Sequence, residues 1–351
     1  MRDYTEKIEI KNQVINNPEW AEYIKTYKNE TRNSSFKSKI YTKIPWRFLS
    51  RSWGKLHNKE MPKILRKSIY SFYIWKYEVK LYEAKNQDLR SYRNLGSFFR
   101  REIDLDGVRP VLNKDQSDLV CPVDGRILSL GRVDSVDGMI KQVKGINYSV
   151  KTLLGPNNQS AENFTSLSNS EYIKTLLKNP THNKLYYTVI YLAPGDYHRF
   201  HSPTEWTITH RRHFPGDLFS VNPKVALWLK NLFALNERII FNGIWKYGFL
   251  SYIPVGATLV GSMKINFDQE IYTSKPYRNS KADKIEKGIY FDKDYQKSDE
   301  KNEGVEMVRG QEIGEFNIGS TVVLLFEGPE NVKFLVEEGE KVKLGIGLIE
   351  I

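Results

Sequence analysis

The pattern of apolar and polar positions divides the chain into a polar start, a helical stretch and a long remainder rich in strands. Residues 1–40 are dominated by Asn, Lys, Glu and Thr with weak periodicity, so we expect a loosely ordered leader. Residues 41–105 place apolar side chains at helical spacing, as at Leu65, Ile69 and Phe72, which predicts a helical region.

The remainder, residues 106–351, alternates short β-branched and aromatic runs with turn signals, which is typical of strands. We predict strands at 186–192, 207–210, 257–265 and 322–326, and a helix at 221–233. The Asn/Ser-rich residues 156–182 predict a surface insertion, and the Lys/Asp/Ser-rich residues 271–303 predict a mobile loop. The fold class we predict is α+β, with a β-rich body behind the helical region.

The positive charge lies in the front part of the chain. The whole chain carries +11, but residues 1–101 hold 23 basic and 10 acidic side chains, whereas residues 102–351 hold 30 and 32. Between Ser50 and Arg101, 13 basic residues stand among ten aromatic ones. Such a front suits an anionic surface, either acidic lipid or nucleic acid. The same pattern also fits a helical subdomain whose apolar face packs on the body.

Cysteine and histidine usage excludes some kinds of site. The single cysteine, Cys121, excludes an internal disulfide framework and any multi-cysteine metal site, and no run of 18 apolar residues appears. Two His-x-x-His pairs, His198 with His201 and His210 with His213, have the spacing of metal half-sites. Two arginines between the second pair oppose a cation, and no acidic ligand stands beside them, so we expect no metal.

A Gly-Ser-Thr sequence at 319–321 lies between two apolar segments, where a bend is the ordinary interpretation. The Ser320 hydroxyl would become a nucleophile only with a base and an orienting carboxylate nearby. The candidate bases are His198 and His201. The candidate carboxylate is Asp124, in a Pro-x-Asp-Gly sequence that is also typical of a simple turn.

Taken together, these motifs resemble phosphatidylserine decarboxylase, most closely the type found in eukaryotic mitochondria. The resemblance runs from about Trp46 to Ile351. Its matching segments are 50–54, 97–101, 122–126, 193–203, 211–216, 236–238, 255–258, 261–262 and 318–321. The family has Leu-Gly-Ser-Thr where this chain has Ile318 followed by Gly-Ser-Thr, which is a conservative departure.

The resemblance implies a cofactor made from the chain itself. Self-cleavage between Gly319 and Ser320 would give fragments 1–319 and 320–351, with Ser320 converted to a pyruvoyl group. Asp124 and His201 would activate Ser320 as a triad. The substrate, phosphatidylserine, would bind the pyruvoyl through its amine and lose carbon dioxide to give phosphatidylethanolamine. His198 would be the acid that reprotonates the product, although the two histidines could exchange roles.

The resemblance also implies architecture, partners and location. It implies a body like a hybrid barrel, a heterodimer of the two fragments, and a peripheral position on an acidic membrane surface, at the mitochondrial inner membrane. A homo-oligomer is left open. The alternative function is a non-enzymatic adaptor that binds acidic lipid through its basic helical front. Nucleic-acid binding is not expected, because no recognisable reader motif accompanies the basic residues.

Overall fold

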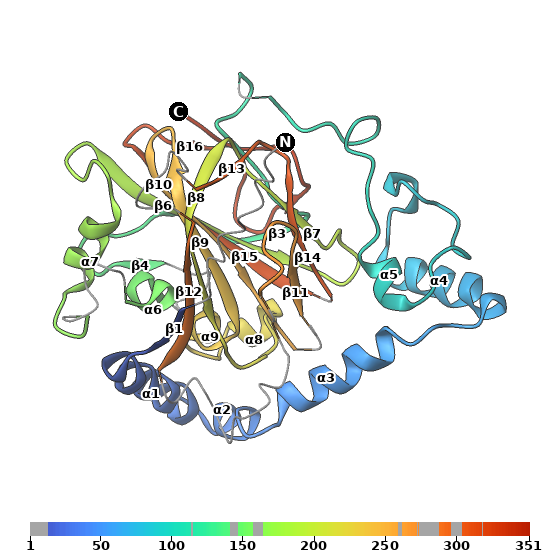
Figure 1. Ribbon diagram of the computed structural model, residues 1–351, viewed down its shortest axis with the longest axis horizontal. Helices are drawn as coiled ribbons and strands as arrows, with labels where there is room; N and C mark the ends of the chain where they lie inside the picture. Colours follow the sequence, from blue (N-terminus) through green and yellow to red (C-terminus); the bar gives the residue numbers. More distant parts are fainter. Residues whose placement is uncertain are drawn as a thin grey trace, which may run out of the picture.

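The computed structural model describes residues 13–113, 115–140, 147–156, 164–258, 262–271, 273, 288–295, 304–317 and 319–351. Within them the fold is α+β: one large antiparallel sheet, several small sheets, and helices at its faces and flank (Figure 1). The predicted fold class is therefore confirmed. None of the helices in the described ranges is long and apolar enough to cross a membrane.

The large sheet contains the strand that begins with Ser320. In spatial order it consists of β1 (Gln13–Asn16), β12 (Ile289–Asp294), β8 (Trp206–Phe214), β9 (Arg238–Trp245), β10 (Gly248–Val255), β15 (Ser320–Pro329), β6 (Asn183–Leu192), β3 (Gly125–Arg132) and β17 (Lys341–Val342), with β13 (Val305–Met307) paired to β8. Strand β15 thus lies inside the sheet, between β10 and β6.

Three small sheets complete the strand pairing. They are β11 (Met263–Ile265), β14 (Glu312–Phe316) and β7 (Arg199–His201); β16 (Lys333–Phe334), β18 (Gly347–Glu350) and β2 (Leu119–Val120); and β4 (Met139–Ile140) with β5 (Tyr148–Ser149). The helices are α1 (Pro18–Asn33), α2 (Phe36–Tyr41), α3 (Trp46–His57), α4 (Lys63–Tyr77), η1 (Leu81–Glu83), α5 (Leu95–Phe99), α6 (Val150–Leu154), α7 (Asn169–Leu176), α8 (Pro223–Ala226) and α9 (Leu232–Leu235).

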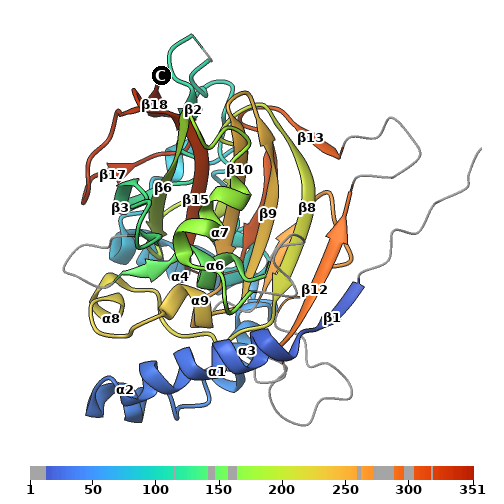
Figure 2. The same cartoon turned by 90° about the vertical axis from the view of Figure 1, so that its left-hand side faces the viewer.

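The large sheet buries a different core on each face, because successive side chains of a strand point to opposite sides. Val323 and Leu325 of β15 belong to the core shared with α1, α6, α7 and α9, and Figure 2 shows α6 and α7 in front of the strands. Val322 and Leu324 belong to the core shared with β7, β11 and β14. By this alternation, Ser320 lies on the face covered by β7 and β14.

Residues 13–40 of the leader that we predicted to be loosely ordered form ordered elements in the structure. Strand β1 pairs with β12, and α1 starts at Pro18 with the Asn17 side chain as its cap. Trp20 and Ile24 are buried in the core beside α6 and α7. One short apolar face is thus enough to order the segment, because remote residues complete the packing around it. Residues 1–12 lie outside the described residues.

Other predicted elements are partly confirmed. The strands predicted at 186–192, 207–210 and 322–326 lie in β6, β8 and β15. The helix at 221–233 is wrong as one unit and consists of the short helices α8 and α9. The strand at 257–265 is confirmed only over β11, and residues 259–261 lie outside the described residues.

The two predicted loops also contain ordered elements. The insertion at 156–182 includes α7, which is packed into the core, and residues 157–163 lie outside the described residues. Within the loop predicted at 271–303, residues 289–294 form β12, and most of the remainder lies outside the described residues.

Helices α3 and α4 extend away from the large sheet at its flank (Figure 1). On α4, Tyr70 is buried and Tyr73 half-buried, whereas Leu65, Ile69 and Phe72 are exposed. The apolar face identified from the sequence therefore points away from the body. This is opposite to the packing expected of an ordinary helical subdomain.

Candidate functional site

Ser320 is the first residue of β15 and pairs with Leu192, the last residue of β6. Its side chain is completely buried, and its Oγ has no hydrogen-bond partner among the described residues. Gly319 before it has a φ of 23°, in the left-handed region that favours glycine. Ile318 lies outside the described residues. Buried hydroxyls of Ser251 and Thr321 also lack partners in the described residues, but only Ser320 directly follows a glycine at positive φ.

The loop that ends at His198, which we call the histidine loop, runs beside the Gly319–Ser320 bond, and His201 follows it in β7. Residues 193–198 connect β6 to β7, while residues 317–319 connect β14 to β15. Because β6 pairs with β15 and β7 pairs with β14, the two connections bridge the same two sheets. Where these connections meet β7 and β14, the backbone N–H of Phe316 donates to the carbonyl of His198 at 2.9 Å.

His198 is fully buried in this loop, with the Phe99 ring 3.9 Å away between centroids. Its Nδ1 lies 2.8 Å from the Asp196 carbonyl, so Nδ1 carries the proton and donates. Burial, helped by the Arg101 charge, lowers the pKa of His198 to about 3. His198 is therefore neutral at pH 7. Its Nε2 lone pair has no partner among the residues described here.

His201 has both ring nitrogens engaged. Its Nδ1 donates to the Gly310 carbonyl at 2.8 Å, and its Nε2 accepts from the Tyr197 hydroxyl at 3.0 Å. Burial lowers the pKa of His201. The lone pair that would take a proton from Ser320 is thus occupied by Tyr197 in the uncut chain.

Asp124 stands directly before β3, which pairs with β6 on the side opposite β15. Its carboxylate accepts two hydrogen bonds from the Arg109 guanidinium, at 2.5 and 3.0 Å, and one from the Leu344 N–H at 2.8 Å. A Cβ at Gly125 would lie 2.4 Å from the Tyr191 carbonyl, so glycine allows this close approach of β3 to β6.

The structure brings Asp124, His198, His201 and Ser320 to one end of β6, but none of them hydrogen-bonds to another. The triad therefore remains a prediction.

Sequence reasoning missed Arg109 and Tyr197, whose side chains hydrogen-bond to Asp124 and His201. Arg109 stands before Pro110 and belongs to none of the motifs, so nothing in the sequence indicated that its guanidinium contacts Asp124.

The helical region also contacts the histidine loop. Tyr73 of α4 donates to the Pro194 carbonyl at 2.6 Å, and Arg101 after α5 donates to the Gly195 carbonyl at 3.1 Å. Arg100 donates to the Asn317 side chain, next to the predicted cut. Figure 1 shows α5 beside β7, β14 and β11. The region that extends outward thus also holds both connections of the site.

The second histidine pair serves a structural purpose. His210 lies 3.5 Å from an Asp292 carboxylate oxygen, and His213 lies 3.0 Å from Glu237. In the described ranges, no three His, Cys, Asp or Glu side chains gather as metal ligands.

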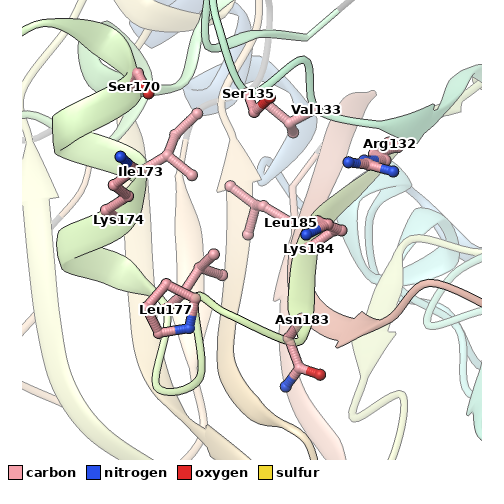
Figure 3. Close-up of a pocket in the computed structure, with 11 residues that line it drawn as sticks. Arg132, Val133, Ser135, Ser170, Ile173, Lys174, Leu177, Asn183, Lys184 and Leu185 are labelled. Carbon is pink, nitrogen blue, oxygen red and sulfur yellow. The ribbon is translucent and has the colours of Figure 1, made fainter.

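A cavity of about 200 Å³ lies between α7 and the strands β3 and β6 (Figure 3). Basic side chains and an apolar floor line it: Arg132, Lys174, Lys184, Ile173, Leu177 and Leu185. It contains none of the four candidate residues, and Lys184 and Arg132 already face Glu330. The four candidate residues lie instead at the buried end of β6 and β15.

Comparisons with known proteins identify the family of this chain. The sequence profile described as phosphatidylserine decarboxylase matches residues 95–350. The mitochondrial phosphatidylserine decarboxylase proenzyme of Pongo abelii is 46% identical over 310 residues, which are 88% of this chain and 73% of that protein. Proenzyme 1 of Saccharomyces cerevisiae is 37% identical over 389 residues, covering 93% of this chain and 76% of that protein.

These matches define an enzyme of the lyase class, a decarboxylase. The chain belongs to the phosphatidylserine decarboxylase family. The resemblance inferred from the motifs is thereby confirmed, and the enzyme is favoured over the lipid-binding adaptor.

Proposed function

We propose that this protein is a mitochondrial enzyme that converts phosphatidylserine to phosphatidylethanolamine and carbon dioxide, using a pyruvoyl group made from Ser320. Family membership supports the reaction, and the relatives named above are mitochondrial proenzymes. The observation that carries the site is the buried Ser320 hydroxyl, without a partner in the described chain, directly after a glycine at positive φ.

In the processing step, the Ser320 hydroxyl attacks the carbonyl of Gly319 and needs a base to take its proton. We assign this to His201, oriented with Asp124. The Tyr197 hydroxyl occupies Nε2 of His201 in the uncut chain, so Tyr197 must either relay this proton or move aside. The Nε2 of His198, which has no partner in the described residues, also supports the exchanged assignment, in which His198 is the processing base. The His198→Ala variant distinguishes the two assignments.

The residues at this position fit a pyruvoyl group, because conversion of Ser320 removes a buried hydroxyl that has no partner in the described residues. The group would supply a carbonyl that withdraws electrons from the substrate as carbon dioxide leaves. His198, which is neutral, can take a proton from the ammonium of phosphatidylserine and later return it to the α-carbon. Phe99 packs against this imidazole and excludes water from it.

The two fragments would remain associated after the cut. Strand β15 belongs to the 320–351 fragment and pairs along its length with β6 and β10, which belong to the 1–319 fragment. Its apolar side chains fill both cores of the large sheet. This packing supports a non-covalent heterodimer. The hybrid-barrel arrangement implied by the resemblance remains part of the proposal.

An intact-mass spectrum of the purified protein tests the proposed function. We expect two fragments, 1–319 and 320–351, the smaller one lighter than a serine start by one ammonia. The same preparation should release carbon dioxide from phosphatidylserine vesicles. A preparation that keeps the mass of the uncut chain after long incubation, and releases no carbon dioxide, contradicts the proposal.

We also propose that α3 and α4 dock the enzyme on an acidic membrane surface, at the mitochondrial inner membrane. Apolar side chains are exposed along both helices: Phe48, Leu49, Trp53, Leu56, Ile64, Leu65, Ile69, Phe72 and Trp75. Exposed lysines accompany them: Lys55, Lys59, Lys63, Lys67 and Lys76. Apolar side chains beside cations bind acyl chains and anionic headgroups together. Tyr73 on the opposite side of α4 contacts the histidine loop, so the docked surface lies close to the site.

Replacement of Phe72 and Trp75 by Ser is expected to weaken vesicle binding by at least about tenfold, since burying each ring contributes about 1.5–3 kcal/mol. These rings are 62% and 73% exposed. Flotation with phosphatidylcholine vesicles, with and without phosphatidylserine, measures the change. The matched control replaces Val136 and Val308, exposed residues elsewhere, by Ser. Equal flotation of both variants would contradict the docking surface.

A further inference from the structure

Arg101 is a buried arginine beside the site that the processing and decarboxylation steps above do not use. It follows α5 and is 5% exposed. Its Nη2 donates to the Gly195 carbonyl at 3.1 Å, and its guanidinium lies 5.7 Å from the centre of the Phe98 ring. Burial lowers the pKa of Arg101, while the charges of Asp124 and Glu83 and the phenols of Tyr73 and Tyr92 oppose this shift.

Two nitrogens of the Arg101 guanidinium make no hydrogen bond within the described residues. Its Nε and Nη1 are buried and have no hydrogen-bond partner among the described residues. No carboxylate in those ranges lies within ion-pair distance of it. A buried cation with unused donors is costly to the free energy of folding unless an anion meets it at some stage.

Neighbouring arginines of the same site do not share this condition. Arg109 contacts Asp124, Arg199 contacts Glu312 at 2.9 Å, and Arg100 contacts Glu315 at 3.4 Å. Each of these cations has a carboxylate of the chain itself. Arg101 thus differs from these arginines because no carboxylate in the described residues pairs with its charge. An unpaired positive charge is what an anion-binding residue requires.

Arg101 also stands where the substrate must react. Its charge contributes to the low pKa of His198, which places the two groups within electrostatic reach. Phe99, two residues earlier, packs on the His198 ring. The preceding residue, Arg100, holds Asn317 beside the predicted cut. An anion on Arg101 would therefore lie next to the group proposed to handle the substrate's proton.

We propose that Arg101 binds the phosphodiester of the substrate headgroup through its charge and one unused donor, Nε or Nη1, an inference that rests on the proposed function. A guanidinium that donates to a phosphodiester oxygen forms a charge-assisted hydrogen bond. The substrate has a second oxyanion, its carboxylate. A cation on the carboxylate would stabilise the group that must lose its charge as carbon dioxide leaves, whereas the phosphodiester keeps its charge throughout the reaction.

Access to Arg101 must follow self-cleavage. In the uncut chain Arg101 Nε, His198 Nε2 and Ser320 Oγ are all sealed from solvent. The cut would free the backbone at Gly319, two residues after Asn317, which Arg100 contacts. The uncut precursor therefore presents no headgroup site, and the cut enzyme does.

Arg101→Gln and Arg101→Lys test the proposal, with each rate divided by the fraction of cut chains. For soluble dihexanoyl phosphatidylserine, we expect Arg101→Gln to raise KM by about 10- to 100-fold while kcat changes by less than about threefold. Arg101→Lys should recover part of this loss, because it keeps the charge without the guanidinium donors. Inhibition by dihexanoyl phosphatidylethanolamine, which keeps the phosphodiester and the amine but lacks the carboxylate, should weaken by the same factor.

Arg66→Gln is the matched control, because Arg66 is 3% exposed and its guanidinium is fully engaged by Glu60 and two carbonyls. It should lower the melting temperature and leave KM and the inhibition constant unchanged. A higher KM with unchanged inhibition would assign Arg101 to the carboxylate and overturn the phosphodiester assignment, and unchanged values of both would overturn substrate binding altogether. In either case an active, cut wild type preserves the proposed function, which fails only if wild type neither cuts nor decarboxylates.

Discussion

Ser320→Ala is expected to yield one uncut chain of 351 residues with no detectable decarboxylase activity. The hydroxyl is the only group of this side chain that can attack the carbonyl of Gly319, and alanine removes it without adding volume. Because Ser320 Oγ has no hydrogen-bond partner in the described ranges, its loss costs no hydrogen bond of the fold. Denaturing gels and intact mass measure the cut, and carbon dioxide release measures activity.

Ser251→Ala provides the control for this change. Ser251 is fully buried in β10, and its hydroxyl also lacks a partner within the described residues. Its partner on β15 is Leu325, well beyond the cut. This variant should mature and act like wild type. Normal cleavage of the Ser320→Ala chain would remove Ser320 from the mechanism.

His198→Ala is expected to mature yet to release carbon dioxide about 10²–10⁴-fold more slowly, the usual contribution of a positioned proton donor. Burial lowers the pKa of His198 to about 3, so the wild-type imidazole enters the reaction neutral and with a free Nε2. The measurement is carbon dioxide release divided by the fraction of cut chains, which separates maturation from decarboxylation.

His210→Ala serves as the control, since His210 faces Asp292 on β12 and lies outside the site. It should retain the wild-type rate within about twofold. If His198→Ala instead remains uncut, His198 is the processing base and the two histidines exchange roles. Full activity in cut His198→Ala would disprove both assignments.

Part of the fold could be predicted because it depends on local pattern. Residues 186–192 and 322–326 read as strands since their β-branched and aromatic side chains are buried on both faces, between two cores. The order of residues 13–40 could not be predicted, since Trp20 becomes a core residue only when Phe164 and Phe214 pack around it. The helix predicted at 221–233 failed for a related reason: Asn231 adopts φ 55° and starts a second short helix.

The candidate site, like the fold, could be predicted only in part. Ser320, Asp124 and the two histidines could be selected from their motifs, because the chemistry limits which residue types can serve. The roles of Arg109, Tyr197 and Arg101 could not be predicted, since each depends on contacts between segments far apart in the sequence. Strand alternation and register place these segments together, and no local pattern encodes that geometry.

The sequence indicated the reaction type and the bond expected to break through the resemblance of its motifs to a known family. It showed the basic, aromatic front directly, because charge and side-chain type are properties of residue order. Only the tertiary structure decided which face of α4 is exposed, which partners Asp124 and His201 have, and that Arg101 lacks a carboxylate within the described chain. The physical reason is that burial and hydrogen bonding depend on neighbours brought together by folding, and these set the charge state and reach of every group in the site.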